Sequence, residues 1–225
     1  MWAHWPDPFV RLAAAAAATS RIKLATGICL LPERDPIVTA KVVASLDVLS
    51  QGRVILGVGG GALKEETEIM GTRFGMRKKC LRENIEAMKE LWTKEEAAYE
   101  GELVRFPAVR IYPKPYQKPH PPVLLGARGL RALARVARYC DGWLPFGISP
   151  EDAREAIATI TRMASEAGRR LERPDVTIMA GLDGLTLELL QRYHEAGVSR
   201  YVVPLPQVPR ELAQLATIVE QAQKI

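Results

Sequence analysis

The feature that most constrains this chain is an almost purely apolar segment that ends in three consecutive glycines. Residues 53–58 predict a strand, and Gly59, Gly60 and Gly61 follow it just before a predicted helix. A strand that is apolar on both faces belongs to a parallel sheet covered by helices on each side. Ligands bind such folds at the carboxyl ends of the strands. Bare backbone at that place favours a flat or phosphorylated ligand lying directly on it. The alternative is a glycine-rich turn without a ligand, although a turn needs only one or two glycines.

Strand and helix patterns alternate along nearly the whole sequence. Predicted strands cover residues 22–31, 53–58, 123–126, 141–146, 176–180 and 201–205. Predicted helices cover residues 8–18, 36–49, 76–93, 130–139, 150–167, 186–196 and 209–224, with a short one after Gly61. This alternation predicts an α/β fold with a parallel sheet, either open and doubly wound or closed as a (β/α)₈ barrel. A barrel needs two strands more than these six.

One helix and one segment outside the alternation carry more specific predictions. Asp35 and Pro36 predict an N-cap followed by proline in the first turn, and the helix they start places Val38, Val42, Leu46 and Leu49 on one apolar stripe. Residues 97–113 break the alternation and predict a hairpin that turns at Glu100 and Gly101. Because there is no repeat, low-complexity tract or charged linker, residues 1–225 are predicted to form one domain.

Composition excludes several classes of function. The formal net charge is +5, but the basic residues are scattered among acids rather than gathered on one face. Nucleic-acid binders concentrate that charge, so we expect no nucleic-acid partner. A weak positive balance suits a phosphorylated cofactor or an anionic substrate.

The cysteines and the hydropathy pattern predict a cytoplasmic protein. Cys29, Cys80 and Cys140 are far apart and form no CxxC pair, which argues against a disulfide framework and a zinc site. No apolar run reaches the ~18 residues of a membrane span, and the start of the chain lacks the pattern of a signal peptide. No metal-spaced cluster of histidines and carboxylates is visible, so no metal is expected.

Longer runs of the sequence resemble a known family. The run TGICLLPERDPIVTAKVVASLDVLSQGRVILGVGGGALKEETEIMGTRFGMR, followed by ENIEAMKELW and RALARVARYCDGWLP, is similar to the bacterial-luciferase-like flavin- and deazaflavin-dependent oxidoreductases. The resemblance covers essentially the whole chain from Pro8 to the last helix. It implies a TIM (β/α)₈ barrel, usually dimeric, that binds FMN or the deazaflavin coenzyme F-420 at the C-terminal mouth of the barrel. The six predicted strands imply that the first one or two βα units of that barrel are lacking.

The resemblance also implies which residues hold the cofactor. One segment would brace the back face of the ring, with Gly27–Ile28 as the candidate for a non-prolyl cis peptide bond. A second would line the ring and ribityl side, and a third would form a phosphate cradle at a helix start, where Arg128 adds a charge-assisted contact. Trp143 would either wall the pocket or pack in the core. The three segments are Thr26, Gly27, Ile28 and Cys29; Gly59, Gly60 and Gly61; and Gly126, Ala127, Arg128 and Gly129.

The sequence departs from the family in ways that leave the catalytic acid or base unassigned. Several deazaflavin relatives carry a glutamate after the glycine strand, but here Ala62 takes that place. Glu65 and Glu66 follow one turn later and are expected on a solvated helix face. The strand-helix-strand segment that begins other family members, often with a histidine, is not found. His4, in the loop before the first helix, is expected to be an ordinary loop histidine, and a position facing the barrel mouth is the alternative.

Two classes of function follow from the resemblance. The first is an oxidoreductase with a noncovalent flavin-type cofactor, acting on a small organic substrate. It would be either an FMN monooxygenase fed by a partner reductase or an F-420-dependent hydride-transfer enzyme. The alternative is a non-catalytic flavin-binding protein or subunit with a shortened barrel. Since a six-stranded sheet exposes two edges, we expect a homodimer.

Overall fold

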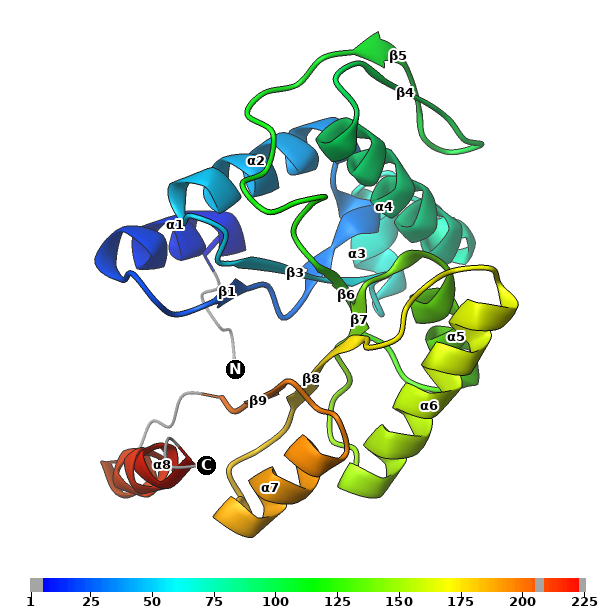
Figure 1. The fold of residues 1–225 in the computed structure, drawn as a ribbon. Helices are drawn as coiled ribbons and strands as arrows, with labels where there is room; N and C mark the ends of the chain where they lie inside the picture. The colour runs from blue at the N-terminus through cyan, green and yellow to red at the C-terminus, as the bar shows by residue number, and fades with distance from the viewer. Residues whose placement is uncertain (1–5, 205–208, 223–225) are drawn as a thin grey trace. The chain divides into compact units, whose positions relative to one another are not determined.

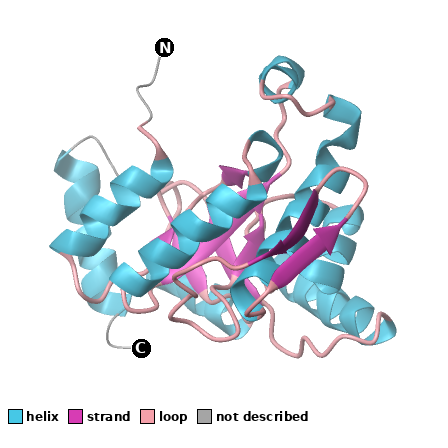
Figure 2. Ribbon diagram, turned by 90° about the horizontal axis from the view of Figure 1, so that it is seen from above, coloured by secondary structure: helices cyan, strands magenta, loops and turns pink. Residues whose placement is uncertain are grey.

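The computed structural model describes residues 6–204 and 209–222, which form two compact units that divide between Leu124 and Leu125. Helices and strands alternate in both (Figures 1 and 2). The first unit contains α1 (Pro8–Ala18), β1 (Leu24–Ala25), β2 (Cys29–Leu30), the 3-10 helix η1 (Leu31–Glu33), α2 (Pro36–Leu49), β3 (Val54–Gly59), α3 (Lys64–Ile69), η2 (Phe74–Met76), α4 (Arg77–Thr93), β4 (Ala97–Glu100) and β5 (Arg105–Val109). Strand β6 (Val123–Leu125) crosses the division. The second unit contains α5 (Leu130–Tyr139), β7 (Gly142–Trp143), α6 (Pro150–Glu166), β8 (Asp175–Met179), α7 (Leu187–Glu195), β9 (Arg200–Val202) and α8 (Pro209–Ala222).

Strand β3 is the centre of the first unit. All six of its residues are buried, as expected for a strand covered on both faces. β1 and β2 both run parallel to it, with Leu24 opposite Val54 and Cys29 opposite Val58. On the other side of β3, Leu56 N donates a 2.9 Å hydrogen bond to the carbonyl oxygen of Pro122, just before β6.

The second unit continues the parallel pattern. Leu144 N donates to the Leu125 carbonyl oxygen at 2.9 Å, β7 pairs with β8 and β8 pairs with β9. Gly142 is required in β7, because a Cβ there would lie 1.9 Å from the carbonyl oxygen of Asp175. The strand order is β1-β3-β6-β7-β8-β9, with β2 also beside β3. The prediction of an α/β fold with a parallel sheet is confirmed.

Most predicted elements lie where expected, and two need correction. The strand predicted at residues 22–31 is interrupted: residues 26–28 separate β1 from β2, although Thr26 N still donates a 3.3 Å hydrogen bond to the Ile55 carbonyl oxygen of β3. The stripe predicted on α2 is buried only in part: Leu46 is 3% exposed, but Val38 is 62% exposed and Leu49 is 72% exposed. The helix is apolar on more than one side, and the face that carries Ala40, Val43 and Ala44 is the one in the core.

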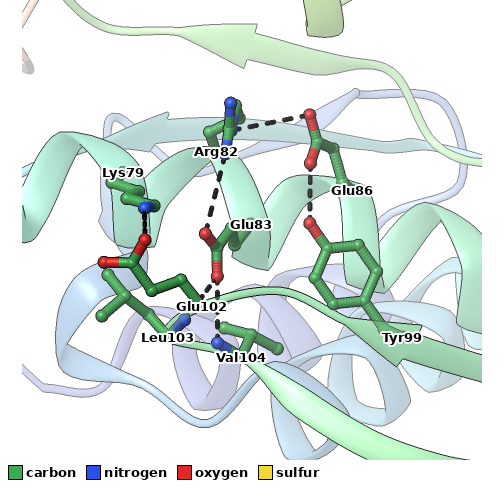
Figure 3. A network of polar contacts seen from close by, with 8 residues as sticks. All are labelled: Lys79, Arg82, Glu83, Glu86, Tyr99, Glu102, Leu103 and Val104. Atoms are coloured by element: carbon green, nitrogen blue, oxygen red, sulfur yellow. Dashed lines mark hydrogen bonds and ion pairs between the residues drawn. The ribbon is translucent and has the colours of Figure 1, made fainter.

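The predicted hairpin is present as β4 and β5, and a buried carboxylate on α4 holds its turn (Figure 3). Glu83 Oε2 accepts hydrogen bonds from the backbone N–H groups of Leu103 and Val104 at 2.8 and 3.0 Å. Burial raises the pKa of Glu83, but the backbone donors outweigh it and the net shift is downward. Glu83 is therefore a structural carboxylate whose hydrogen bonds shape the turn.

Two further findings concern the cysteines and the hydropathy of the helices. Cys29, Cys80 and Cys140 are all free and buried. Among the described residues, no helix is long and apolar enough to cross a membrane.

Candidate functional site

The first candidate segment lies at the break between β1 and β2. Thr26 is buried, and its hydroxyl donates a 2.7 Å hydrogen bond to the carbonyl oxygen of Gly57 in β3. The Gly27–Ile28 peptide bond is cis, as predicted. Gly27 is exposed and Ile28 is half-buried, so this stretch of backbone faces outward while Thr26 ties it to the sheet.

Gly59 is packed directly against this segment. A Cβ at Gly59 would lie 2.0 Å from Ile28 Cδ1, so no side chain fits there while Ile28 keeps its place. Leu30 and Gly59 are also register partners in the parallel ladder of β2 and β3. The first two predicted segments are therefore brought together within one unit, at the carboxyl ends of neighbouring strands.

The other two glycines of the triplet turn the chain from β3 toward α3. Gly61 has φ +75°, a conformation that favours glycine. Its carbonyl oxygen accepts a 3.2 Å hydrogen bond from Arg77 Nε, and the Arg77 guanidinium lies 3.6 Å from the centre of the Phe74 ring. A Cβ added to Gly60 would make ordinary van der Waals contacts, with Arg77 Cγ and Leu81 Cδ2 both at 3.8 Å. The turn after β3 therefore consists of glycines, and a hydrogen bond from the Arg77 side chain fixes its position.

Cys29 does not offer a reactive thiol. It is 2% exposed, and burial raises its pKa to about 11, so the thiolate is strongly disfavoured. Its contribution to the segment is packing in the strand, as a small apolar side chain.

The sequence did not predict a carboxyl group that lies beside Gly61. Glu33, at the end of η1, is half-buried, and its Oε1 is buried without a hydrogen-bond partner among the described residues. A Cβ on Gly61 would lie 3.4 Å from this oxygen. Burial raises the pKa of Glu33, and the nearby Glu66 raises it further. The sequence offered no signal, because Glu33 and Gly61 are far apart in the chain and meet only where β2 and β3 pair.

The third candidate segment opens α5 in the second unit. Gly129 is the N-cap of α5, with φ +87° and no side-chain cap. Nothing lies within 4 Å of an added Cβ there, and Arg128 and Gly129 are both exposed. No ion-pair partner for Arg128 occurs among residues 6–204 and 209–222. The first turn of a helix presents unpaired N–H groups and a positive dipole end, so this segment fits a phosphate.

Trp143 belongs to this segment as a buried brace. It is 3% exposed, and its indole Nε1 donates a 2.7 Å hydrogen bond to the carbonyl oxygen of Ala127. Of the two roles that the sequence left open, packing is the one that the contacts describe. The hydrogen bond holds the loop of Gly126–Gly129 against the end of β7.

The remaining candidates are the two glutamates of α3, His4 and the residue types that bind metals. Glu65 and Glu66 are exposed on α3, as expected. His4 lies outside the described residues. Among the described residues, no group of three or more histidine, cysteine, aspartate or glutamate side chains is arranged to hold a metal ion.

Comparisons with known proteins identify relatives of this chain. An uncharacterized protein of Mycobacterium tuberculosis is 42% identical over 204 residues, which cover 89% of this chain and 70% of that protein. The oxygenase component of the flavin-dependent trigonelline monooxygenase of Acinetobacter baylyi is 31% identical over 178 residues, covering 77% of this chain and 49% of its own length. This chain therefore spans about half of that oxygenase.

The likeness of fold extends to a deazaflavin enzyme. The structure of an F420-dependent secondary alcohol dehydrogenase, in complex with an F420-acetone adduct, superposes with a TM-score of 0.81 at 16% identity. The match covers 96% of this chain and 84% of the dehydrogenase, and at that identity it speaks for the fold alone. The sequence pattern of the luciferase-like monooxygenases matches residues 1–182. The chain belongs to the luciferase-like monooxygenase family.

Proposed function

We propose that this chain is an oxidoreductase that binds a noncovalent flavin-type cofactor, FMN or the deazaflavin F-420, and acts on a small organic substrate. The observation that carries the proposal is that Thr26–Cys29 lies beside Gly59–Gly61: Leu30 pairs with Gly59 at the end of β3, and the Ile28 side chain packs on Gly59. Members of the family are flavin- or F420-dependent oxidoreductases and monooxygenases. Backbone without side chains lets a planar ring approach it closely. Gly27, Gly60 and Gly61 offer such backbone beside Ile28, whose Cδ1 covers Gly59.

Different segments would contact different parts of the cofactor. Gly59, Gly60 and Gly61, with Gly27 and Ile28, would contact the ring and the ribityl side of the cofactor. The loop of Gly126, Ala127, Arg128 and Gly129 would bind the phosphate through backbone N–H groups and the Arg128 guanidinium. Trp143 orients that loop through Ala127. When bound, the ring supplies the redox chemistry, while the protein positions it and excludes water.

The test is a fluorescence titration of the purified protein with FMN and with F-420, measured separately. Saturable binding of one of them supports the proposal, and binding of neither contradicts it. Arg128→Ala is expected to weaken FMN binding by roughly 10- to 100-fold, the equivalent of one hydrogen bond between charged groups. Riboflavin, which lacks the phosphate, should bind the variant and the wild type alike. Arg138→Ala, an exposed arginine at the other end of α5, is the matched control and should leave both affinities unchanged.

The source of the electrons would depend on which cofactor is bound. With FMN, a partner reductase would deliver the electrons, and with F-420 the cofactor would exchange a hydride with the substrate. Binding without any turnover over a panel of small organic substrates would support the alternative, a non-catalytic flavin-binding protein. The free, buried cysteines suit the predicted cytoplasmic location.

We propose further that the chain is a single luciferase-like domain that forms a homodimer through α1 and α2. A groove of about 600 Å³ lies between these helices, and Val10, Val38 and Leu49 are exposed at 69%, 62% and 72%. Apolar side chains gathered in this way are typical of an interface. Light scattering should give a mass above the 24.9 kDa of one chain. Val38→Glu should lower it, whereas Ile69→Glu, at an 83% exposed position on α3, should not.

A further inference from the structure

A cavity of about 390 Å³ lies in the second unit, where the last turns of α7 meet the start of β9. Residues of α7 and residues 198–201 line it, together with Ala222 of α8. Because Arg200 begins β9, the cavity lies at the amino end of that strand, whereas Gly126–Gly129 follow the carboxyl end of β6. It is therefore no part of the proposed cofactor site.

One part of the cavity wall is apolar. The rings of Tyr193 and Tyr201 pack with their centroids 5.3 Å apart. The Tyr193 hydroxyl donates to the carbonyl oxygen of Ile148, and the Tyr201 hydroxyl donates to that of Gly181 at 3.3 Å. Since both hydroxyls are engaged, the two tyrosines offer the cavity the surface of their rings. The other apolar side chains of the wall are Leu190 and Val198.

The polar part of the wall carries hydrogen-bond donors and no carboxylate. Gln191, His194, Ser199 and Arg200 line the cavity, and among the described residues no aspartate or glutamate does so. Ser199 Oγ accepts a 3.4 Å hydrogen bond from Val176 N, which leaves its own proton to donate. Gln191 and His194 are exposed, and their side chains make no hydrogen bond or ion pair with any residue that the structure describes. The cavity therefore favours a ligand that accepts hydrogen bonds.

Arg200 supplies a positive charge in a fixed orientation. Its Nε donates to Thr177 Oγ1 at 3.2 Å and its Nη2 donates to Asp175, so two bonds hold the guanidinium. An arginine has five N–H groups, and Nη1 of Arg200 has no acceptor within residues 6–204 and 209–222. The side chain is 31% exposed, so a ligand in the cavity can reach it. Two parallel N–H groups of a guanidinium match the two oxygens of a carboxylate.

The end of α7 does not present bare carbonyl groups to an anion. The carbonyl oxygens of residues 192–194 accept hydrogen bonds from the N–H groups of residues 196–198. These bonds satisfy acceptors that a helix otherwise leaves unpaired at its C-terminus. The Arg192 side chain, on the same helix, pairs instead with Glu151 of α6.

We propose that this cavity binds a small aromatic carboxylate. Its oxygens would accept hydrogen bonds from the Arg200 guanidinium and the Ser199 hydroxyl, and its ring would pack against Tyr201. The donor set selects the anion, and the tyrosine wall selects the apolar body. Binding is noncovalent and needs neither FMN nor F-420. The protein then has a second ligand site, at the other end of the strands from the glycine segments.

The test is a ¹H–¹⁵N NMR titration of the full chain with benzoate and with benzamide, which has the same ring but no charge. Benzoate should bind saturably and shift the backbone amides of residues 190–201. Benzamide should bind at least about 10-fold more weakly, because it lacks the charge that Arg200 recognises. Equal affinities for the two compounds, the absence of saturable benzoate binding, or shifts confined to other residues would each overturn the proposal.

Three variants locate the binding groups. Ser199→Ala, at an exposed position, should weaken benzoate binding roughly 3- to 10-fold through the loss of one donor. Arg200→Lys keeps the charge and a donor for Asp175 but loses the planar fork, and should weaken binding by roughly 10-fold. Arg192→Gln is the matched control, since Arg192 is exposed on α7 and does not line the cavity. Unchanged benzoate affinity in Ser199→Ala and Arg200→Lys would refute the assignment, and Ser199→Ala decides the matter by itself should Arg200→Lys not fold.

A cofactor titration separates this site from the proposed function. Saturating FMN should leave the affinity for benzoate unchanged, and competition between the two would show that benzoate occupies the cofactor site instead. If benzoate binds and neither FMN nor F-420 does, the proposed function is refuted while the second site stands.

Discussion

Trp143 Nε1 donates a 2.7 Å hydrogen bond to the carbonyl oxygen of Ala127, and this contact joins the end of β7 to the loop that starts α5. The indole is buried, so the bond is shielded from water. The sequence allowed Trp143 either to wall the pocket or to pack in the core. In the structure it fixes the position of the loop that is proposed to bind the phosphate. Its effect on a ligand would be indirect, through the position of the loop.

Replacing Trp143 with phenylalanine should separate this bracing from packing. The ring stays, but the donor is lost, and we expect unfolding free energy to fall by about 1 kcal/mol. FMN should bind more weakly while riboflavin is nearly unaffected. Trp92→Phe is the control, because Trp92 is also buried and its Nε1 donates a 2.9 Å bond to Ala40 in the other unit. Equal losses of FMN affinity in both variants would contradict the bracing role.

The contact between Gly59 and Ile28 predicts a destabilising substitution with a defined rescue. Gly59→Ala would place a methyl group 2.0 Å from Ile28 Cδ1, which should cost about 1–3 kcal/mol of unfolding free energy. Adding Ile28→Val removes Cδ1 and should recover most of that loss in a double-mutant cycle. Gly60→Ala, where the nearest atom is 3.8 Å away, should be well tolerated. Purely additive losses from the two substitutions would show that the contact is not the cause.

The buried carboxylate of Glu83 predicts a loss of stability that depends on pH. Glu83→Ala leaves the N–H groups of Leu103 and Val104 without their acceptor, which should cost about 1–3 kcal/mol at neutral pH. Because the folded-state pKa of Glu83 is lowered, its contribution is present above the ordinary glutamate pKa of about 4.3 and is lost as the pH falls through the folded value. Urea unfolding should therefore show the wild type and the variant converging on acidification. Glu90→Gln, at a half-buried partner of Lys94 on the same helix, should change stability by less than about 0.5 kcal/mol at any pH.

Glu33 predicts a pH dependence of the opposite sign, measurable without cofactor. Its folded-state pKa is raised, so the folded protein binds the proton more tightly than the unfolded chain does. The wild type should lose stability relative to Glu33→Gln as the pH rises from the ordinary glutamate value to the folded one, and the difference should then stay constant. Chemical unfolding across that range measures it, with Glu65→Gln as the exposed control. A wild type that gains stability over the same range would show that Glu33 is ionised and held by a partner.

Local patterns predicted most elements of the fold. The start of α2 follows from Asp35, whose carboxylate accepts a 2.9 Å bond from Val38 N, and from the proline after it. The apolar run before Gly59 predicted a buried parallel strand, and the cis bond at Gly27–Ile28 was expected from the resemblance. These features depend on residues that are close in sequence, or on a motif that occurs as one run.

Tertiary packing decided which face of an apolar helix is buried and which residues far apart in the sequence come together. The sequence determined that α2 is a helix, but its neighbours decided that Val38 and Leu49 are exposed while Ala40 and Val43 are in the core. It supplied Glu33 and Gly61 without any sign that they meet, because the pairing of β2 with β3 is what brings these strand ends together. Local propensity acts between near neighbours in the chain, whereas the burial and pKa of Glu33 arise from atoms that only the folded chain assembles around it.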